Sequence, residues 1–123
     1  MAGRNTLIEL DGAIARACFV ISNDSAAAHI AAFRAVPALV VMNGATMGHC
    51  HPYPQNGLYP VPPKLVFRHM PCFGCDWNCR YPMFKGQALP CLQEIQVNDV
   101  AEDAIDLIHR AGCAPVVALP TMP

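Results

Sequence analysis

The sequence contains little charge, and the charge it has shows no bias toward one sign. Of the 123 residues, eight are Lys or Arg and nine are Asp or Glu, so the formal net charge at pH 7 is -1 and only 14% of the residues are charged. No basic run is present that could neutralise the phosphates of a nucleic acid. We therefore expect no nucleic-acid partner.

Long hydrophobic runs are absent as well. No uninterrupted apolar stretch reaches the roughly 18 to 20 residues of a membrane-spanning helix, and the first six residues lack the charged-then-apolar layout of a signal peptide. We expect no transmembrane segment and a cytoplasmic protein. Apolar residues still make up 54% of the chain, which is typical of a piece of a larger protein whose partner-facing surface stays apolar.

Helical and strand patterns alternate along the chain. Thr6 and Glu9 form a candidate capping box at the start of one helix, and Asp99 and Glu102 form another. Short apolar runs between helices are typical of buried parallel strands. The alternation predicts an α/β fold with a doubly wound parallel sheet and right-handed crossovers. The expected helices cover residues 7–17, 26–35 and 99–111, and the expected strands cover residues 18–22, 38–42 and 65–68.

The length of the chain is enough for one domain. We place this domain at residues 1–113 and a proline-rich tail at residues 114–123. The other prolines concentrate between Pro52 and Pro90, so regular structure is expected mainly outside that region. The loop at residues 43–64 is too long to be passive in a compact domain, which indicates a function there.

A polar turn joins the first expected strand to the second expected helix. Asn23, Asp24 and Ser25 stand at the carboxyl end of the strand, where open α/β sheets bind ligands. The N–H groups and the dipole of the helix favour an anion there, and a diphosphate is the obvious candidate. His29 follows Ser25 by one helical turn, so its imidazole can reach the same zone. The alternative is that Asp24 only caps the helix and that His29 is a packed core histidine.

A second polar loop, Gly44-Ala45-Thr46, follows the next expected strand at its carboxyl end. Glycine permits backbone conformations that other residues do not adopt, and the Thr46 hydroxyl can bind a phosphate. His49 and His51 alternate just beyond it, which is a metal-ligand pattern. Without a carboxylate partner nearby, such a pair is more often a coincidence of the loop sequence than a metal site.

The chain has seven cysteines, four of them clustered. Cys18 lies in an apolar run and is expected to be a small buried hydrophobe, dispersed like Cys50 and Cys113. The C-x2-C-x3-C-x11-C spacing of the other four predicts a structural metal site, with zinc favoured over iron. Free buried thiols, a redox-active C-x-x-C and two disulfides are the alternatives. The four clustered residues are Cys72, Cys75, Cys79 and Cys91.

Taken in order, these segments resemble the C-terminal domain of family 9 glycosyltransferases, the group of the lipopolysaccharide heptosyltransferases. The resemblance covers about residues 3–111. Its most specific part is the Asn-Asp-Ser turn followed by His29-Ile30-Ala31-Ala32. The ordered series also includes Thr6-Leu7-x-Glu9-Leu10, Val20-Ile21-Ser22, Val36-Pro37-Ala38-Leu39-Val40-Val41, Gly44-Ala45-Thr46, Pro52-Tyr53-Pro54, the four clustered cysteines and Asn98-Asp99-Val100.

The resemblance implies a two-domain, B-type glycosyltransferase fold of Rossmann-like halves, of which this chain is part of the C-terminal, donor-binding one. Such enzymes transfer a sugar from a nucleotide donor, typically ADP-heptose, to lipopolysaccharide or a related glycan acceptor. The resemblance also allows peripheral attachment at the inner membrane. It assigns the donor site to Asn23, Asp24, Ser25, Ala26, Ala27, His29, Gly44, Ala45 and Thr46.

The resemblance places the catalytic carboxylate in the other domain and requires no metal cofactor for transfer. We therefore expect no catalytic residue in this chain and no transfer by the chain alone. Two positions depart from the family pattern: Ala26 stands where glycine is usual, and Ala45 stands where proline is common. The competing hypothesis is a small metal-stabilised structural or interaction module without catalysis.

Overall fold

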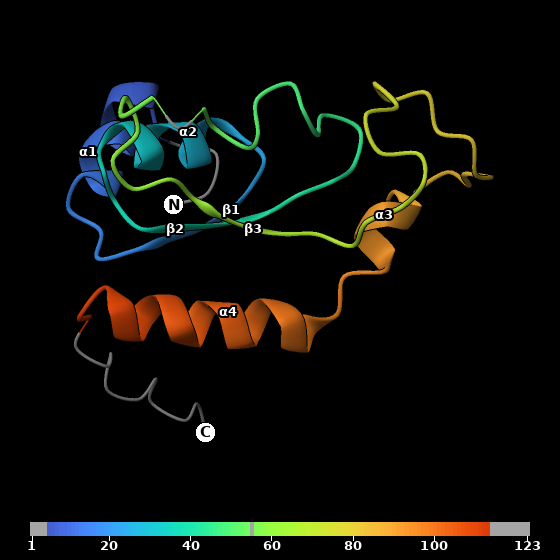
Figure 1. Cartoon of the computed structure of the whole chain (residues 1–123). Helices are drawn as coiled ribbons and strands as arrows, with labels where there is room; N and C mark the ends of the chain where they lie inside the picture. The colour runs from blue at the N-terminus through green and yellow to red at the C-terminus, as the bar shows by residue number, and fades with distance from the viewer. Residues whose placement is uncertain (1–4, 55, 114–123) are drawn as a thin grey trace.

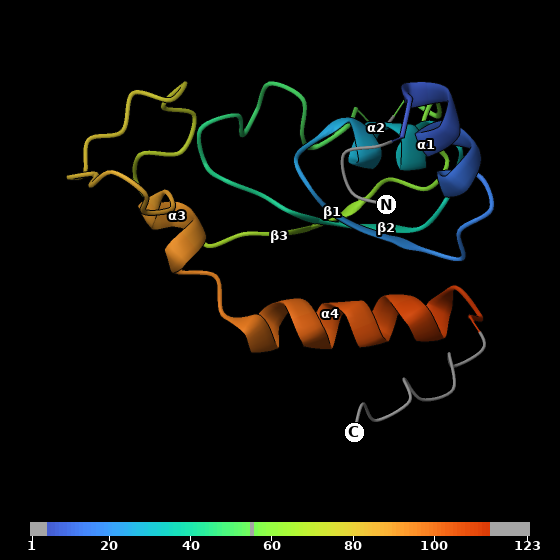
Figure 2. The ribbon, with the colours of Figure 1, turned by 180° about the vertical axis from the view of Figure 1, so that it is seen from behind.

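Three parallel strands form the middle layer of the structure, a computed structural model that describes residues 5–54 and 56–113 (Figure 1). The strands lie in the order β1-β2-β3, with β2 in the centre. The helices α1 and α2 cover one face of the sheet and α4 covers the other, as the view from behind also shows (Figure 2). The elements are α1 (Leu7–Ile14), β1 (Val20–Asn23), α2 (Ala26–Phe33), β2 (Ala38–Val41), β3 (Lys64–Val66), α3 (Pro90–Gln93) and α4 (Val97–Arg110).

The central strand β2 is buried on both faces. Its side chains alternate, so Val40 packs with Ala28 of α2 on one side, whereas Leu39 packs with Val66 and Ala104 on the other. Burial on both faces explains why the strand is a continuous apolar run without polar alternation. The expected α/β class with a parallel sheet between helices is thus confirmed.

The N-terminal helix begins as expected and ends earlier. The Thr6 hydroxyl accepts a hydrogen bond from the Glu9 N–H, and the Glu9 carboxylate accepts one from the Thr6 N–H at 2.8 Å, which confirms the capping box. The helix α1 stops at Ile14, three residues before the expected end at residue 17. Ile14 is buried in one cluster with Ala31 of α2 and Ala38 of β2, so α1 packs beside α2 over the same face of the sheet.

The start of the long C-terminal helix was placed incorrectly by the sequence pattern. The helix α4 begins at Val97, and the residue before it, Gln96, is the N-cap. Asp99 is the third helical residue, and its carboxylate accepts a hydrogen bond from the Gln96 N–H at 3.2 Å. The expected box of Asp99 with Glu102 is therefore wrong. The expected buried face is confirmed for Ala104, which packs on β2 and β3.

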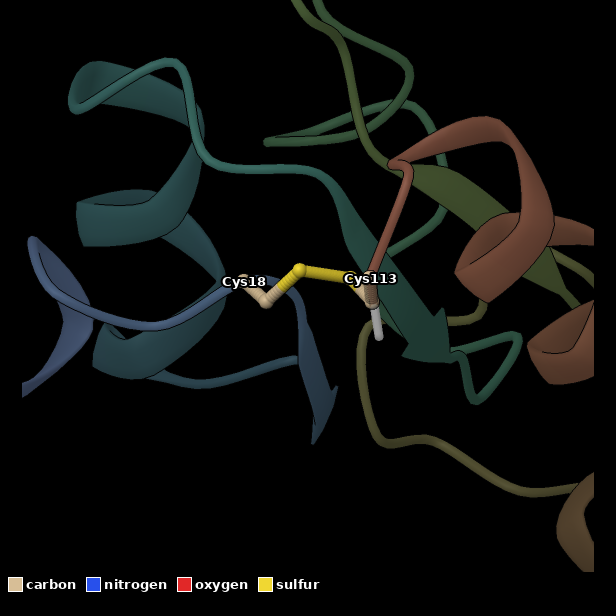
Figure 3. The surroundings of a disulfide bond; sticks show 2 residues. All are labelled: Cys18 and Cys113. Atoms are coloured by element: carbon tan, nitrogen blue, oxygen red, sulfur yellow. A yellow bond between two sulfur atoms is a disulfide. The ribbon is translucent and has the colours of Figure 1, made fainter. Parts of the chain in front are cut away.

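A disulfide joins Cys18, just before β1, to Cys113, just after α4 (Figure 3). The two Cα atoms are 5.9 Å apart, and 95 positions separate the two residues in the sequence. Cys18 is exposed, so the expectation of a buried, isolated thiol is wrong. The expected tail at residues 114–123 lies outside the described residues. Within the described part of the chain, no helix combines the length and the apolar character that crossing a bilayer requires.

Candidate functional site

The carboxyl ends of the three parallel strands meet at one edge of the sheet, and the candidate residues gather there. The turn at residues 23–25 leads from β1 into α2, and the loop beginning at residue 42 leaves β2 beside it. The Thr46 hydroxyl donates a hydrogen bond to Asp24 Oδ2 at 2.7 Å. The two loops that the sequence singled out are therefore in contact.

Asp24 does not cap the helix. The N-cap of α2 is Ser25, and within the described residues it makes no side-chain capping bond to the helix. Asp24 is only 10% exposed, and its Oδ1 atom faces two histidines, with His29 Nε2 at 3.7 Å and His51 Nε2 at 3.4 Å. The side chain of His29 is 40% exposed, so it is not a packed core histidine. The alternative, in which Asp24 only caps the helix and His29 is a packed core histidine, is therefore wrong in both parts.

His51 is a functional candidate that sequence reasoning set aside. Its side chain is 1% exposed, and no described residue forms a hydrogen bond with either of its ring nitrogens. Its ring stacks on that of His29, with the centroids 5.2 Å apart. Burial lowers the pKa of His51, an effect that the carboxylate of Asp24 opposes. The missing carboxylate partner of the histidine pair is Asp24, which lies 27 positions upstream and could not be paired with it from spacing.

Tyr53 completes this group. Its hydroxyl forms a hydrogen bond with His29 Nδ1, which leaves His29 Nε2 as the nitrogen nearest Asp24. Burial raises the pKa of Tyr53 to about 12, so the phenol stays protonated at neutral pH. Its ring also stacks on Tyr59, with the centroids 4.2 Å apart. Two signals pointed to Tyr53: its position in the long loop at residues 43–64 and the segment Pro52-Tyr53-Pro54 in the family resemblance.

Gly44 and Ala45, two of the expected donor-binding residues, are buried and face the cysteine-rich segment. The Gly44 N–H donates to Cys91 Sγ at 3.4 Å, and the Gly44 carbonyl accepts from the Gly74 N–H at 2.7 Å. The Ala45 N–H is held by Asn43 Oδ1 at 2.8 Å. Of the loop at residues 44–46, Thr46 is the member that reaches the Asp24 turn. The other two attach that loop to the cysteine segment.

The reason for glycine at position 44 also differs from the expectation. Its φ does not lie in the left-handed region, so conformational freedom is not required there. A Cβ atom at Gly44 would instead lie 2.3 Å from Cδ1 of Phe73. Close packing of the Phe73 ring on the backbone therefore requires the glycine. The nearby Gly48 has a φ of 90° and does need that freedom.

The four clustered cysteines line one narrow, mostly apolar cavity of about 10 Å³. Cys72 and Cys91 are buried and the other two are half-buried, and the structure pairs none of the four in a disulfide. Among the described residues, the group whose metal-ligand atoms all lie within 4.8 Å of one another is Asp24, His29 and His51, and the four thiols form no such group. The structure thus brings the cysteine side chains to one place without gathering them as a zinc site. Metal binding there stays a prediction.

Comparison of the chain with family models, with curated proteins and with solved structures finds no match. The geometry of the described residues offers two candidate sites, one around Asp24 and one around the cysteine cavity. The resemblance to family 9 glycosyltransferases stays a prediction.

Proposed function

We propose that the chain binds the diphosphate of a nucleotide sugar, of the ADP-sugar class, as the donor-binding part of a family 9-like glycosyltransferase. The observation that carries this proposal is the hydrogen bond between Thr46 and Asp24. It places a hydroxyl-bearing loop beside the N-terminus of α2, at the carboxyl edge of a parallel sheet. In open α/β sheets this edge is where ligands bind.

The N-terminus of α2 suits an anion. Since Ser25 makes no side-chain capping bond within the described chain, the first N–H groups of the helix are left for a ligand. The small side chains of Ala26 and Ala27 allow a phosphate to approach the backbone. The negative charge of Asp24 opposes an anion, but the side chain is 10% exposed and hydrogen-bonded to Thr46. His29, half-exposed beside it, supplies a compensating positive charge when protonated.

The proposal extends to the type of fold, to a second domain and to the location of the protein. Helices on both faces of a parallel sheet are typical of a Rossmann-like, doubly wound domain. By the resemblance, a second domain supplies the acceptor site and the catalytic carboxylate, so the chain alone binds donor and transfers nothing. The cytoplasmic location is part of the same proposal. Because disulfides such as Cys18–Cys113 are more typical of oxidising compartments, cell fractionation tests the location separately from nucleotide binding.

The test is an ADP titration followed by backbone amide NMR, with a chelator present so that no metal takes part. We expect shifts at residues 23–29 and at Thr46 that are lost in Asp24→Ala, because without this carboxylate the Thr46 loop is no longer held beside α2. This loss outweighs the removal of the opposing charge. Glu102→Ala, an exposed acidic residue on α4, is the matched control and should bind as the parent does. Unshifted amides at the turn in a folded sample would contradict the proposal.

A second candidate function is a metal-stabilised module built on the cysteine segment. The specific observation that favours it is that Cys72, Cys75, Cys79 and Cys91 line one cavity. Within that segment Asp76 and Trp77 have φ values of 47° and 65°, which non-glycine residues seldom adopt. Such conformations persist where the surroundings fix them, and a metal bound by the flanking thiolates would do so.

Metal analysis of the purified chain tests the second candidate. Four thiolates at about 2.3 Å from one tetrahedral zinc lie about 3.8 Å from one another. Among the described residues, no three of the four sulfur atoms lie that close together. An iron–sulfur cluster is several atoms across and separates its thiolates further. We expect about one equivalent of zinc, or a reconstituted cluster with visible absorption, that Cys91→Ser removes while Cys50→Ser does not. A folded chain whose metal content is the same in Cys91→Ser as in Cys50→Ser would exclude this function.

A further inference from the structure

We infer that Asp24, His29 and His51 form a binding site for a divalent transition metal ion, with zinc as the best fit. The inference goes beyond nucleotide binding because these residues would hold the ion without any nucleotide present. Each offers one ligand atom, and these atoms all lie within 4.8 Å of one another. Two imidazole nitrogens and one carboxylate oxygen are a ligand set that zinc uses readily.

The two distances from the Asp24 carboxylate fit a single ion, and the two histidine nitrogens lie within 4.8 Å of each other. Two ligands at about 2.0–2.1 Å from a tetrahedral zinc lie about 3.4 Å apart. Asp24 Oδ1 lies 3.4 Å from His51 Nε2 and 3.7 Å from His29 Nε2. Small side-chain shifts therefore suffice to place all three atoms around one ion. The other Asp24 oxygen is fixed by the Thr46 hydroxyl, which orients the carboxylate.

His51 provides the second, independent observation. A buried polar group without a hydrogen bond is costly, and such groups in folded proteins normally have a partner. The ring of His51 is 1% exposed, and across the described residues its two nitrogens find no hydrogen-bond partner. A metal ion would give Nε2 a partner where this nitrogen lies, 3.4 Å from Asp24 Oδ1. A simple packing role leaves the burial of Nε2 without a hydrogen bond unexplained.

Tyr53 has the place of an outer partner of a metal ligand. Histidines that bind metals usually engage the second ring nitrogen in a hydrogen bond, which fixes the tautomer and the ring orientation. His29 Nδ1 is bonded to the Tyr53 hydroxyl, and Nε2 is the nitrogen near Asp24. When Nδ1 carries the proton and donates a hydrogen bond to the phenol oxygen, Nε2 presents its lone pair to the ion.

Three protein ligands leave a coordination position open to water or to another oxygen ligand. His29 is half-exposed, so this position is on the solvent side of the cluster. A diphosphate oxygen could occupy it, and the ion would then offset the repulsion between the phosphates and Asp24. This last step, unlike ion binding itself, rests on the proposed function.

The test is a titration of the whole purified chain with Co²⁺ as a spectroscopic probe for zinc, without nucleotide. Cobalt bound by thiolates shows intense sulfur-to-metal charge-transfer bands, whereas a site of nitrogen and oxygen ligands shows only the weaker visible bands. The Co²⁺ ions bound by thiolates and those bound at the proposed site can thus be counted separately. We expect one Co²⁺ per chain that lacks the sulfur signature and that zinc displaces.

The variants form a graded series. His51→Ala and Asp24→Asn should each remove this ion. Asp24→Asn keeps a side-chain oxygen that can accept the hydrogen bond from Thr46, so it tests the site even if His51→Ala does not fold. Tyr53→Phe should weaken binding by about 10–100-fold, as outer-partner changes do. His49→Ala changes an exposed histidine two positions from His51 and should leave binding unchanged.

The outcomes separate this inference from the proposed function. An ion bound equally by the parent, His51→Ala and Asp24→Asn overturns the metal site, whatever ADP does. The absence of any cobalt signal without sulfur character in the folded parent overturns it as well. Failure of ADP to bind in chelator overturns nucleotide binding by the turn itself and leaves the metal site standing.

Discussion

Replacing Gly44 by alanine tests how the loop after β2 is held against the cysteine-rich segment. The added Cβ atom would lie 2.3 Å from Cδ1 and 2.5 Å from Cε1 of the Phe73 ring, so the ring must move. The backbone at Gly44 has no positive φ, so alanine introduces no conformational strain of its own. Overpacking of this kind costs about 1–3 kcal/mol. Because Phe73 is half-buried and can shift in part, we expect a loss of about 2 kcal/mol.

A double-mutant cycle with Phe73→Ala isolates the clash. With the ring removed, Gly44→Ala should cost less than about 0.5 kcal/mol, which gives a coupling energy of about 1.5 kcal/mol. The assay is urea denaturation of the four proteins, with the slope checked for constancy. Gly48→Ala is the control, because a Cβ atom at Gly48 would meet nothing within 4 Å. This change should cost about 1–2 kcal/mol because Gly48 has a positive φ, and the cost should be the same with or without the Phe73 ring. Equal destabilisation by Gly44→Ala in both backgrounds would refute the reasoning.

Three further predictions concern stability. Replacing both Cys18 and Cys113 by serine should lower the free energy of unfolding by about 2–4 kcal/mol, since the disulfide closes a loop of 95 positions; an unchanged denaturation midpoint would contradict this. Met42→Ala should cost about 2–5 kcal/mol because Met42 is fully buried, measured in the same assay. Hydrogen bonds from Arg34 lower the pKa of Asp11 below 3.8, so the pair stabilises the fold above about pH 4 and is lost as pH falls through the lowered pKa. Asp11→Asn should therefore flatten the acid end of the stability curve, and an unaltered curve would exclude the pair as its cause.

The sequence predicted the layered fold well where burial decides the structure. The run at residues 38–42 is apolar because β2 is covered on both faces, and that pattern needs no tertiary information. Helix ends were less accurate, because Gln96 was not recognised as a cap and Asp99 resembles one. The four-residue helix α3 at Pro90–Gln93 was missed, since it is too short to show a period and begins at a proline.

For the candidate site, too, the sequence predicts the positions of some residues and not of others. Contact between Asp24 and Thr46 was predictable, because both follow neighbouring parallel strands at one edge. The place of His51 was not, since it depends on how a long loop without periodicity folds back over α2. The Cys18–Cys113 bond joins residues 95 positions apart, and no local pattern pairs such residues.

That bond also gives the molecule an unusual response to cutting. Cys18 and Cys113 make the backbone between them a closed ring that contains the sheet, α2, α3 and α4 and leaves α1 outside. A single protease nick in an exposed stretch such as residues 56–58 opens the ring but releases no fragment. Without reductant the two pieces of the nicked protein would run as one band on a denaturing gel, and with reductant they would separate. The tether also holds the two pieces at a high effective concentration, so α4 can return to the sheet after local opening regardless of dilution.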